Sequence, residues 1–170
     1  MLAITMASMT RALRGIESPP HPRSTSLLEE ALTIAQAAGS RHATAVALVA
    51  SGDLAWRRGE THAAANHWRH ALELRCEIQD ARGVAAGLER AALSAIASGD
   101  APRAVRMFSA AESERERLGL VLHYDEAADH EHWLDAARNA QEPEEFMRNW
   151  TTGRGLSRLE ATRQALDPVM

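Results

Sequence analysis

The chain contains no lysine: all 19 basic residues are arginines, which together with the abundant alanine is typical of a high-GC bacterial genome. Aromatic residues make up only 4% of the chain, β-branched residues are sparse, and no stretch alternates between apolar and polar residues. Strands favour those residue types and show that alternation, so the composition excludes a β-sheet protein. Alanine, leucine, arginine and glutamate are helix formers, and their dominance predicts an all-α fold.

Cysteine and long apolar runs are also scarce. Cys76 is the only cysteine, so no internal disulfide can form, and this fits a reducing cytoplasm. No stretch reaches the roughly 18 apolar residues that a transmembrane helix needs. The N-terminal stretch MLAITMASMTRALRG makes a poor signal peptide, because its first basic residue, Arg11, follows the apolar part. The sequence therefore predicts a cytoplasmic protein with no membrane segment.

The net charge is −4, and positive charge is nowhere concentrated. Binding to nucleic-acid phosphates requires a concentrated basic face. The densest basic spots, at residues 57–58 and 115–117, have acidic neighbours, and we interpret them as solvated helix surface. The charge pattern therefore predicts no direct binding to nucleic acid.

One stretch of the chain recurs, because GETHAAANHWRHA at 59–71 returns as GDAPRAVRMFSAA at 99–111. Gly59, Ala64, Trp68 and Ala71 of the first copy match Gly99, Ala104, Phe108 and Ala111 of the second. A constant shift of about 40 residues lies within the range of helical-repeat periods. The recurrence predicts antiparallel helix pairs that stack into one domain.

Helix-breaking and capping residues set the expected boundaries within a single domain over residues 1–170. Three prolines between 19 and 22 separate the first two helices. Ser26 with Glu29 offers a capping box for the second helix, or Ser24 caps it slightly earlier. The expected pairs span 2–38, 42–78 and 82–118, and capping helices within 124–167 begin near Asp125, Pro143 and Ser157, with Asp100 as a further N-cap.

Packing expectations follow from the small and bulky residues. Gly52 and Ala64 are expected to let the helices of the 42–78 pair approach closely, and Trp68 is expected to fill the groove against the next pair. The tail is expected to cap the open end of the array with one apolar side. That side consists of Trp133, Leu134, Phe146, Trp150, Leu156 and Leu159.

The spacing of these residues resembles the tetratricopeptide repeat, W-x2-L-G-x2-Y followed by A-x3-F and then P. The small and aromatic positions match, whereas Leu48 replaces the tryptophan, Ala55 replaces the tyrosine and Cys76 falls near the proline. The period is also longer than the usual 34 or so residues. The resemblance implies a right-handed superhelix of antiparallel helix pairs with a C-terminal helical cap.

Elongated repeats of this kind resemble the C-terminal region of bacterial LuxR-type and SARP-type transcriptional regulators built on STAND NTPases. AVRMFSAAESERERLG resembles their last repeat and NWTTGRGLSRLEA their closing pattern, which is matched by Trp150, Gly153, Arg154, Leu156, Ser157, Glu160 and Ala161. The chain has no phosphate-binding GxxxxGK[ST] motif and no recognisable helix-turn-helix. The resemblance therefore implies the repeat module without the NTPase and DNA-binding domains.

Histidine-rich stretches are the candidates for metal chemistry. His62, His67 and His70 share one expected helix, and HYDEAADHEHW gathers His123, Asp125, Asp129, His130, Glu131 and His132. Without an HExxH arrangement or a third ligand at helical spacing, we interpret the first three as surface or packing histidines. We interpret the second stretch as a solvated acidic helix start, because His130 and His132 point to different sides of a helix. No nucleophile can be matched with a base and an orienting group. The sequence therefore predicts no enzyme, no metal and no cofactor.

The expected binding site is the concave face of the superhelix, which in tetratricopeptide arrays is lined mainly by the first helix of each pair. Helical phase places seven residues there: Val49, Asp53, Trp56, Arg57, Glu89, Leu93 and Ile96. Trp56 has two interpretations, since it either contacts the partner or packs against a neighbouring helix.

Two functions from different classes remain open. One is a non-catalytic module that binds a protein, a peptide or a small effector and reports it to an NTPase and DNA-binding partner. The other is an autonomous histidine-rich metal-binding or hydrolytic helical protein. A homodimer formed through the exposed N-terminal face is a third, simpler arrangement.

Overall fold

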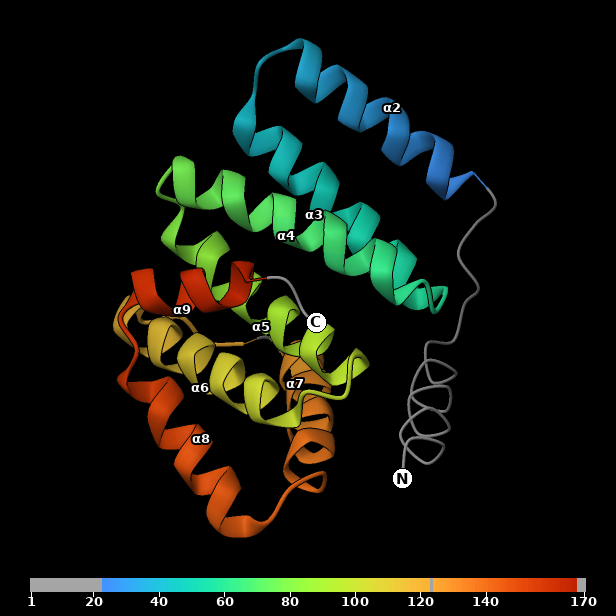
Figure 1. Ribbon diagram of the computed structural model, residues 1–170. Coiled ribbons are helices and arrows are strands. Elements are labelled where there is room, and N and C mark those ends of the chain that lie inside the picture. Colours follow the sequence, from blue (N-terminus) through green and yellow to red (C-terminus); the bar gives the residue numbers. More distant parts are fainter. Residues whose placement is uncertain (1–22, 123, 168–170) are drawn as a thin grey trace. The chain divides into compact units, whose positions relative to one another are not determined.

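The computed structural model describes residues 23–122 and 124–167, without the side chains of residues 124–126. Every regular element among these residues is a helix, which confirms the all-α prediction (Figure 1). The expected first helix, over 2–14, lies outside the described residues. The chain divides into two compact units, Met1–Gln79 and Asp80–Met170, and each is described by itself.

The first unit contains α2 (Ser24–Ala37), α3 (Arg41–Arg57) and α4 (Thr61–Glu77). Figure 1 shows α3 between the other two, and it packs against both. Small residues of α3, such as Ala45 and Ala55, are buried and let its neighbours come close. The largest buried side chains of this unit are those of Leu48, Trp56, Trp68 and Leu72.

The predicted caps of α2 are wrong. The helix begins at Ser24 with Arg23 as the N-cap residue, and no side chain caps it. The Ser26 hydroxyl instead donates to the Arg23 carbonyl oxygen at 3.0 Å, a local bond that serine makes readily near a helix start. In α3 the cap is Ser40, whose hydroxyl oxygen accepts from the Ala43 amide at 3.2 Å.

Helix boundaries recur along the chain. The helix α5 (Ala81–Ala97) begins and ends 40 residues after α3. Left-handed backbone follows five of the described helices, at Gln79 with φ of 56° and at four glycines, Gly39, Gly59, Gly99 and Gly119, with φ between 64° and 81°. Glycine adopts this conformation without the Cβ clash that other residues suffer, which explains why the helices end there. The expected cap at Asp100 is confirmed, since its carboxylate accepts from the Arg103 amide.

The second unit contains α5, α6 (Ala101–Leu118), α7 (Tyr124–Arg138), α8 (Pro143–Gly155) and α9 (Arg158–Leu166). Helix α6 is its centre and contacts the other four helices (Figure 1). Its buried residues therefore lie on almost every side, including Met107, Phe108, Ser109 and Glu114. Within the described residues, no helix combines the length and the apolar character needed to cross a membrane.

The tail helices begin close to the predicted residues. Pro143 starts α8, and Ser157 with Glu160 forms the predicted capping box of α9. Asp125 does not precede α7, because that helix already begins at Tyr124.

Of the expected buried tail residues, Leu134 and Phe146 are buried, whereas Trp133, Trp150 and Leu156 are half-buried. The prediction for Leu159 is wrong, because its side chain is 70% exposed. Helix α9 packs instead through the opposite side, where Ala161, Thr162 and Ala165 are buried.

Candidate functional site

Two residues of the predicted binding face, Asp53 and Trp56, meet Trp68 inside the first unit. The indole Nε1 of Trp68 donates to Asp53 Oδ1 at 2.8 Å. The Trp56 and Trp68 rings lie 5.4 Å apart at an interplanar angle of 43°. Because both tryptophans are buried, Trp56 is a packing residue between α3 and α4. The second interpretation of Trp56 therefore describes it.

Gly52 makes room for this arrangement. A Cβ at Gly52 would lie 2.4 Å from the Trp68 ring, so the predicted close approach at Gly52 is confirmed. The structure describes Trp68 within its own pair, and its packing against the next pair stays a prediction. Its ring occupies the space that the missing side chain leaves within its own pair, where it also finds an acceptor for its N–H group.

The other predicted face residues of the first unit are more open. Val49 is half-buried and Arg57 is exposed. Between Arg41 and Arg57 the structure adds Val46, whose side chain is 50% exposed and lies on the same side of α3 by helical phase. Sequence reasoning missed Val46, although its spacing from Ala50, Asp53 and Arg57 carries the signal.

The predicted face residues of the second unit have different environments. Leu93 is half-buried, and Ile96 is buried in α5. Glu89 is half-buried and lies in a polar centre with Arg115 of α6 and His130 of α7. Only Leu93 of these three is both partly exposed and without a charged group, so it is the one open to an apolar contact.

The polar centre is built on the Glu89 carboxylate. It accepts a hydrogen bond from the Arg115 guanidinium, and its Oε1 lies 3.0 Å from His130 Nδ1. A carboxylate can only accept, so the hydrogen of this bond must sit on Nδ1. The His130 ring also stands edge-on to Phe108, with centroids 5.1 Å apart. Arg115 and His130 both bond to the Glu89 carboxylate, so charge-assisted hydrogen bonds join three helices at this centre.

Sequence reasoning missed this centre because its members lie 26 and 41 residues apart along the chain. The interpretation of Arg115 and His130 as surface side chains is wrong. Both side chains are largely buried, at 11% and 12% exposed, because α5 and α7 both pack against α6. Pairs that are so far apart in the chain leave no repeating pattern by which a single sequence could reveal them.

Replacing Glu89 with glutamine is expected to lower the free energy of unfolding by about 1 kcal/mol, the difference between a charge-assisted and a neutral hydrogen bond. The amide keeps the shape of the side chain but offers the buried Arg115 no negative charge. Urea unfolding followed by circular dichroism measures the change. Glu131→Gln, on the exposed side of α7, is the control and is expected to have no measurable effect. Equal losses in the two variants would contradict the role of the centre.

A second set of ion pairs fastens the tail to α6. Arg154 of α8 contacts Glu112 at 3.2 Å and Glu116 at 2.5 Å. The Glu114 carboxylate, only 2% exposed, accepts from Arg117 at 3.1 Å and from Arg158 Nε at 2.6 Å. The acidic residues of ESERER in α6 are therefore bound by arginines, most of which come from the tail.

Gly153 brings α8 onto α6. A Cβ at this position would lie 1.9 Å from Ser109 Oγ and 2.2 Å from the Arg106 carbonyl oxygen, so only glycine fits there. Nearby, Arg106 Nη1 donates to Asn149 Oδ1 at 3.0 Å. With Arg154 in its ion pairs and Ser157 and Glu160 in their capping box, four residues of the closing pattern, Gly153 included, have a structural task.

Two exposed carboxylates, those of Glu116 and Glu160, have lowered pKa values, and the two shifts have separate causes. A hydrogen bond from Arg154 holds the pKa of Glu116 below its usual value. Hydrogen bonds from the Ser157 hydroxyl and amide lower the pKa of Glu160. Because a folded pKa below the unfolded one favours the charged form, this stabilisation is present above the unfolded pKa of about 4.3 and is lost as the pH falls through the folded value.

Replacing Arg154 with glutamine is therefore expected to raise the pKa of Glu116 toward its ordinary value. The pKa of Glu160 is expected to stay low, because its cause lies in Ser157. Carboxyl-carbon titration by NMR measures both groups in one experiment. An unchanged Glu116, or two carboxylates that shift together, would contradict the assignment of these causes.

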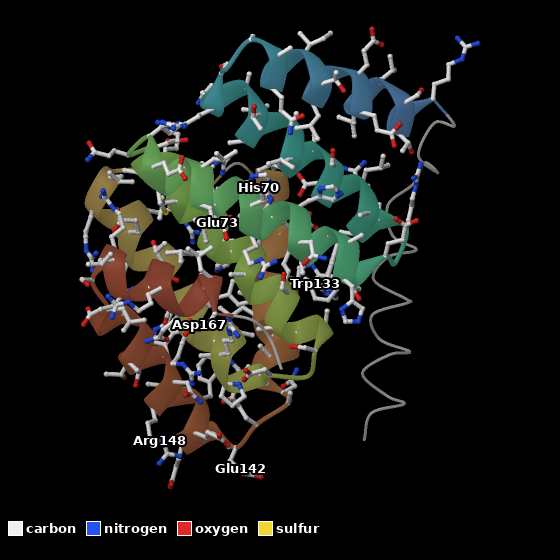
Figure 2. All side chains as sticks on the ribbon, turned by 45° about the horizontal axis from the view of Figure 1, so that its top comes forward. His70, Glu73, Trp133, Glu142, Arg148 and Asp167 are labelled. Carbon is white, nitrogen blue, oxygen red and sulfur yellow. The ribbon has the colours of Figure 1, made fainter. Side chains whose placement is uncertain are left out.

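The predicted histidine clusters do not converge in the part of the chain that the structure describes. His62 and His70 are exposed and His67 is half-buried on α4, where Figure 2 shows His70 beside Glu73. His132 packs edge-on to Trp133, with centroids 5.0 Å apart. Among the described residues, no group of three or more His, Cys, Asp or Glu side chains could hold a metal ion. His123 and the Asp125 side chain lie outside those residues.

Comparisons of the chain with protein-family models, with curated proteins and with solved structures found no match.

Proposed function

We propose that this chain is a non-catalytic interaction or effector-sensing helical-repeat module of a bacterial transcriptional or signalling regulator. It would act with NTPase and DNA-binding domains in the same chain or in a partner. The observation that carries the proposal is the docking of NWTTGRGLSRLEA onto AVRMFSAAESERERLG through Gly153 and Arg154. These are the two stretches that resemble the end of such regulators, and they pack against each other.

A tetratricopeptide-like superhelix is part of the proposal. It is supported by the matching bounds of α3 and α5 and by the left-handed residues at Gly59 and Gly99. Stacked repeats require helix hairpins of matching length with turns at equivalent positions. The wide, exposed surfaces of such arrays suit binding of a protein, a peptide or a small effector.

The proposed contact residues are those that packing leaves available. On α3 they are Val46, Val49 and Arg57, a face with apolar side chains at one end and a positive charge at the other. Leu93 on α5 is a further candidate. Trp56 and Ile96 are withdrawn as contacts, because both are buried within their units.

Site-specific photo-crosslinking in bacterial cells tests the function. A photoreactive residue at Val49 of the full chain is expected to capture a protein with nucleotide-binding and DNA-binding domains, identified by mass spectrometry. The control is the same residue at the exposed Leu159 of α9. Equal capture at both positions would count against this face. Stoichiometric metal in the untagged purified protein would favour the histidine-based alternative instead.

A further inference from the structure

The turn between α4 and α5 contains a strained backbone residue. Gln79 has a φ of 56°, and among the described residues it is the one non-glycine residue with a positive φ. In this left-handed region the Cβ comes close to the following carbonyl oxygen, which disfavours the conformation about ten-fold for most residues. A short polar side chain can offset part of this penalty with a local hydrogen bond, whereas the side chain of glutamine is longer. The turn therefore has a conformation that its own residue disfavours.

The recurrence of the chain places glycine at the equivalent positions. Gly39, Gln79 and Gly119 lie 40 residues apart and follow α2, α4 and α6. All three have left-handed backbone, with φ of 64°, 56° and 65°. Glycine adopts this conformation without strain at the first and third positions. Of these three turns, only the one after α4 is strained.

This turn is also the boundary between the two compact units, because the first unit ends at Gln79 and the second begins at Asp80. Three residues, 78–80, join α4 to α5. The turns at Gly59 and Gly99 lie within the units, where the packed pairs α3–α4 and α5–α6 hold them. A change of backbone conformation at Gln79 therefore leaves each pair packed and changes only the direction in which the chain enters the second unit.

A continuous helix is the conformation that this junction can adopt instead. Residues 72–79, LELRCEIQ, are mostly helix formers, glutamine included. In a continuous helix, the last carbonyl groups of α4 and the first amides of α5 would gain the partners that helix ends lack. Asp80 opposes this change, because its carboxylate caps α5 by accepting from the Gly83 amide at 2.9 Å. Strain at Gln79 thus favours the continuous helix, and the cap at Asp80 favours the turn.

We propose that the turn at Gln79 is a hinge, which exchanges between the left-handed turn and a continuous α4–α5 helix and so reorients the two units as bodies. The inference does not depend on the proposed function. It adds a conformational device, because a ligand that binds one of the two states more tightly shifts the chain toward that state.

Pulsed electron spin resonance on the full chain tests the hinge by measuring the distance between two spin labels. In a Cys76→Ala background, the labels are attached at Glu73→Cys on α4 and Ser98→Cys after α5, both exposed positions. A continuous helix places these two positions about 38 Å apart, and any bend brings them closer. Asp80→Ala removes the cap and is expected to raise the population at the long distance about five- to ten-fold. Adding Gln79→Gly, which relieves the strain of the turn, is expected to lower that population again by about ten-fold.

Asp100→Ala is the matched control. Asp100 caps α6 in the same way, by accepting from the Arg103 amide at 3.0 Å, but it lies inside the second unit. The control is expected to leave the distance between the labels unchanged. An equal change in the control would overturn the proposal, as would a distance distribution that neither Asp80→Ala nor Gln79→Gly alters.

Thermal unfolding of the unlabelled chain tests the strain by itself. Gln79→Gly is expected to raise the unfolding midpoint, because glycine adopts the left-handed turn without a Cβ clash. Gly99→Gln places glutamine in a left-handed turn inside the second unit and is expected to lower the midpoint. A midpoint that falls in the Gln79→Gly variant would overturn the strain on which the hinge depends.

Discussion

Replacing Trp68 with alanine is expected to lower the free energy of unfolding by about 3–5 kcal/mol, the range for removing a large buried aromatic side chain. The ring is 4% exposed, packs on Trp56 and fills the space above Gly52. Its loss leaves a cavity between α3 and α4 and removes the Nε1–H donor that bonds to Asp53. Urea unfolding followed by far-ultraviolet circular dichroism measures the change.

A second substitution at the same position separates packing from hydrogen bonding. Trp68→Phe keeps a ring over Gly52 but removes the Nε1–H donor to Asp53, so it is expected to cost clearly less than the alanine variant. If the two variants lose the same stability, the hydrogen bond and not the packed ring dominates. A loss below about 1 kcal/mol for Trp68→Ala would contradict the packing described for the first unit.

Replacing Gly153 with alanine is expected to destabilise the second unit by about 1–3 kcal/mol, as overpacking does. The new Cβ would meet the Arg106 carbonyl oxygen at 2.2 Å, and a backbone atom cannot move aside without shifting α6. Helix α8 would lift from α6 and weaken the ion pairs of Arg154 with Glu112 and Glu116. Thermal unfolding and the Glu116 titration both report this displacement.

Gly155 provides the matched control in the same helix. A Cβ there would meet nothing within 4 Å, and alanine favours helix over glycine by up to about 1 kcal/mol. Gly155→Ala is therefore expected to leave stability unchanged or to raise it slightly. Effects of the same sign and size at Gly153 and Gly155 would mean that the close contact between α8 and α6 does not exist in solution.

Local chemistry made the helices predictable. The glycines at 59 and 99 need no partner to favour a left-handed turn, and Asp100 caps the next helix with its own carboxylate. Ser157 and Glu160 likewise act within four residues of each other. The predicted cap of α2 was wrong because two serines near the helix start could each make local bonds. The Ser26 hydroxyl donates to the Arg23 carbonyl oxygen, and Arg23 is the N-cap residue.

The packing neighbours of each helix were harder to predict, because one pattern of apolar residues can pack against several different helices. The helical phase of Trp68 does not say which neighbour its ring meets, and only the fold shows that the ring fills the space above Gly52. Leu159 looked like a core residue by type, yet α9 buries small residues on its other side. Phase alone placed Trp56 on an open face, whereas in the folded unit its ring packs on Trp68.

The sequence by itself determined that the chain is helical and where most helices begin and end, because capping and helix propensity act over a few residues. Only the tertiary structure decided which charges are buried together. Glu89, Arg115 and His130 come from three helices, and Glu114 meets Arg158 from the tail. Such pairs form because desolvated charges need partners, and the fold brings those partners from distant parts of the chain.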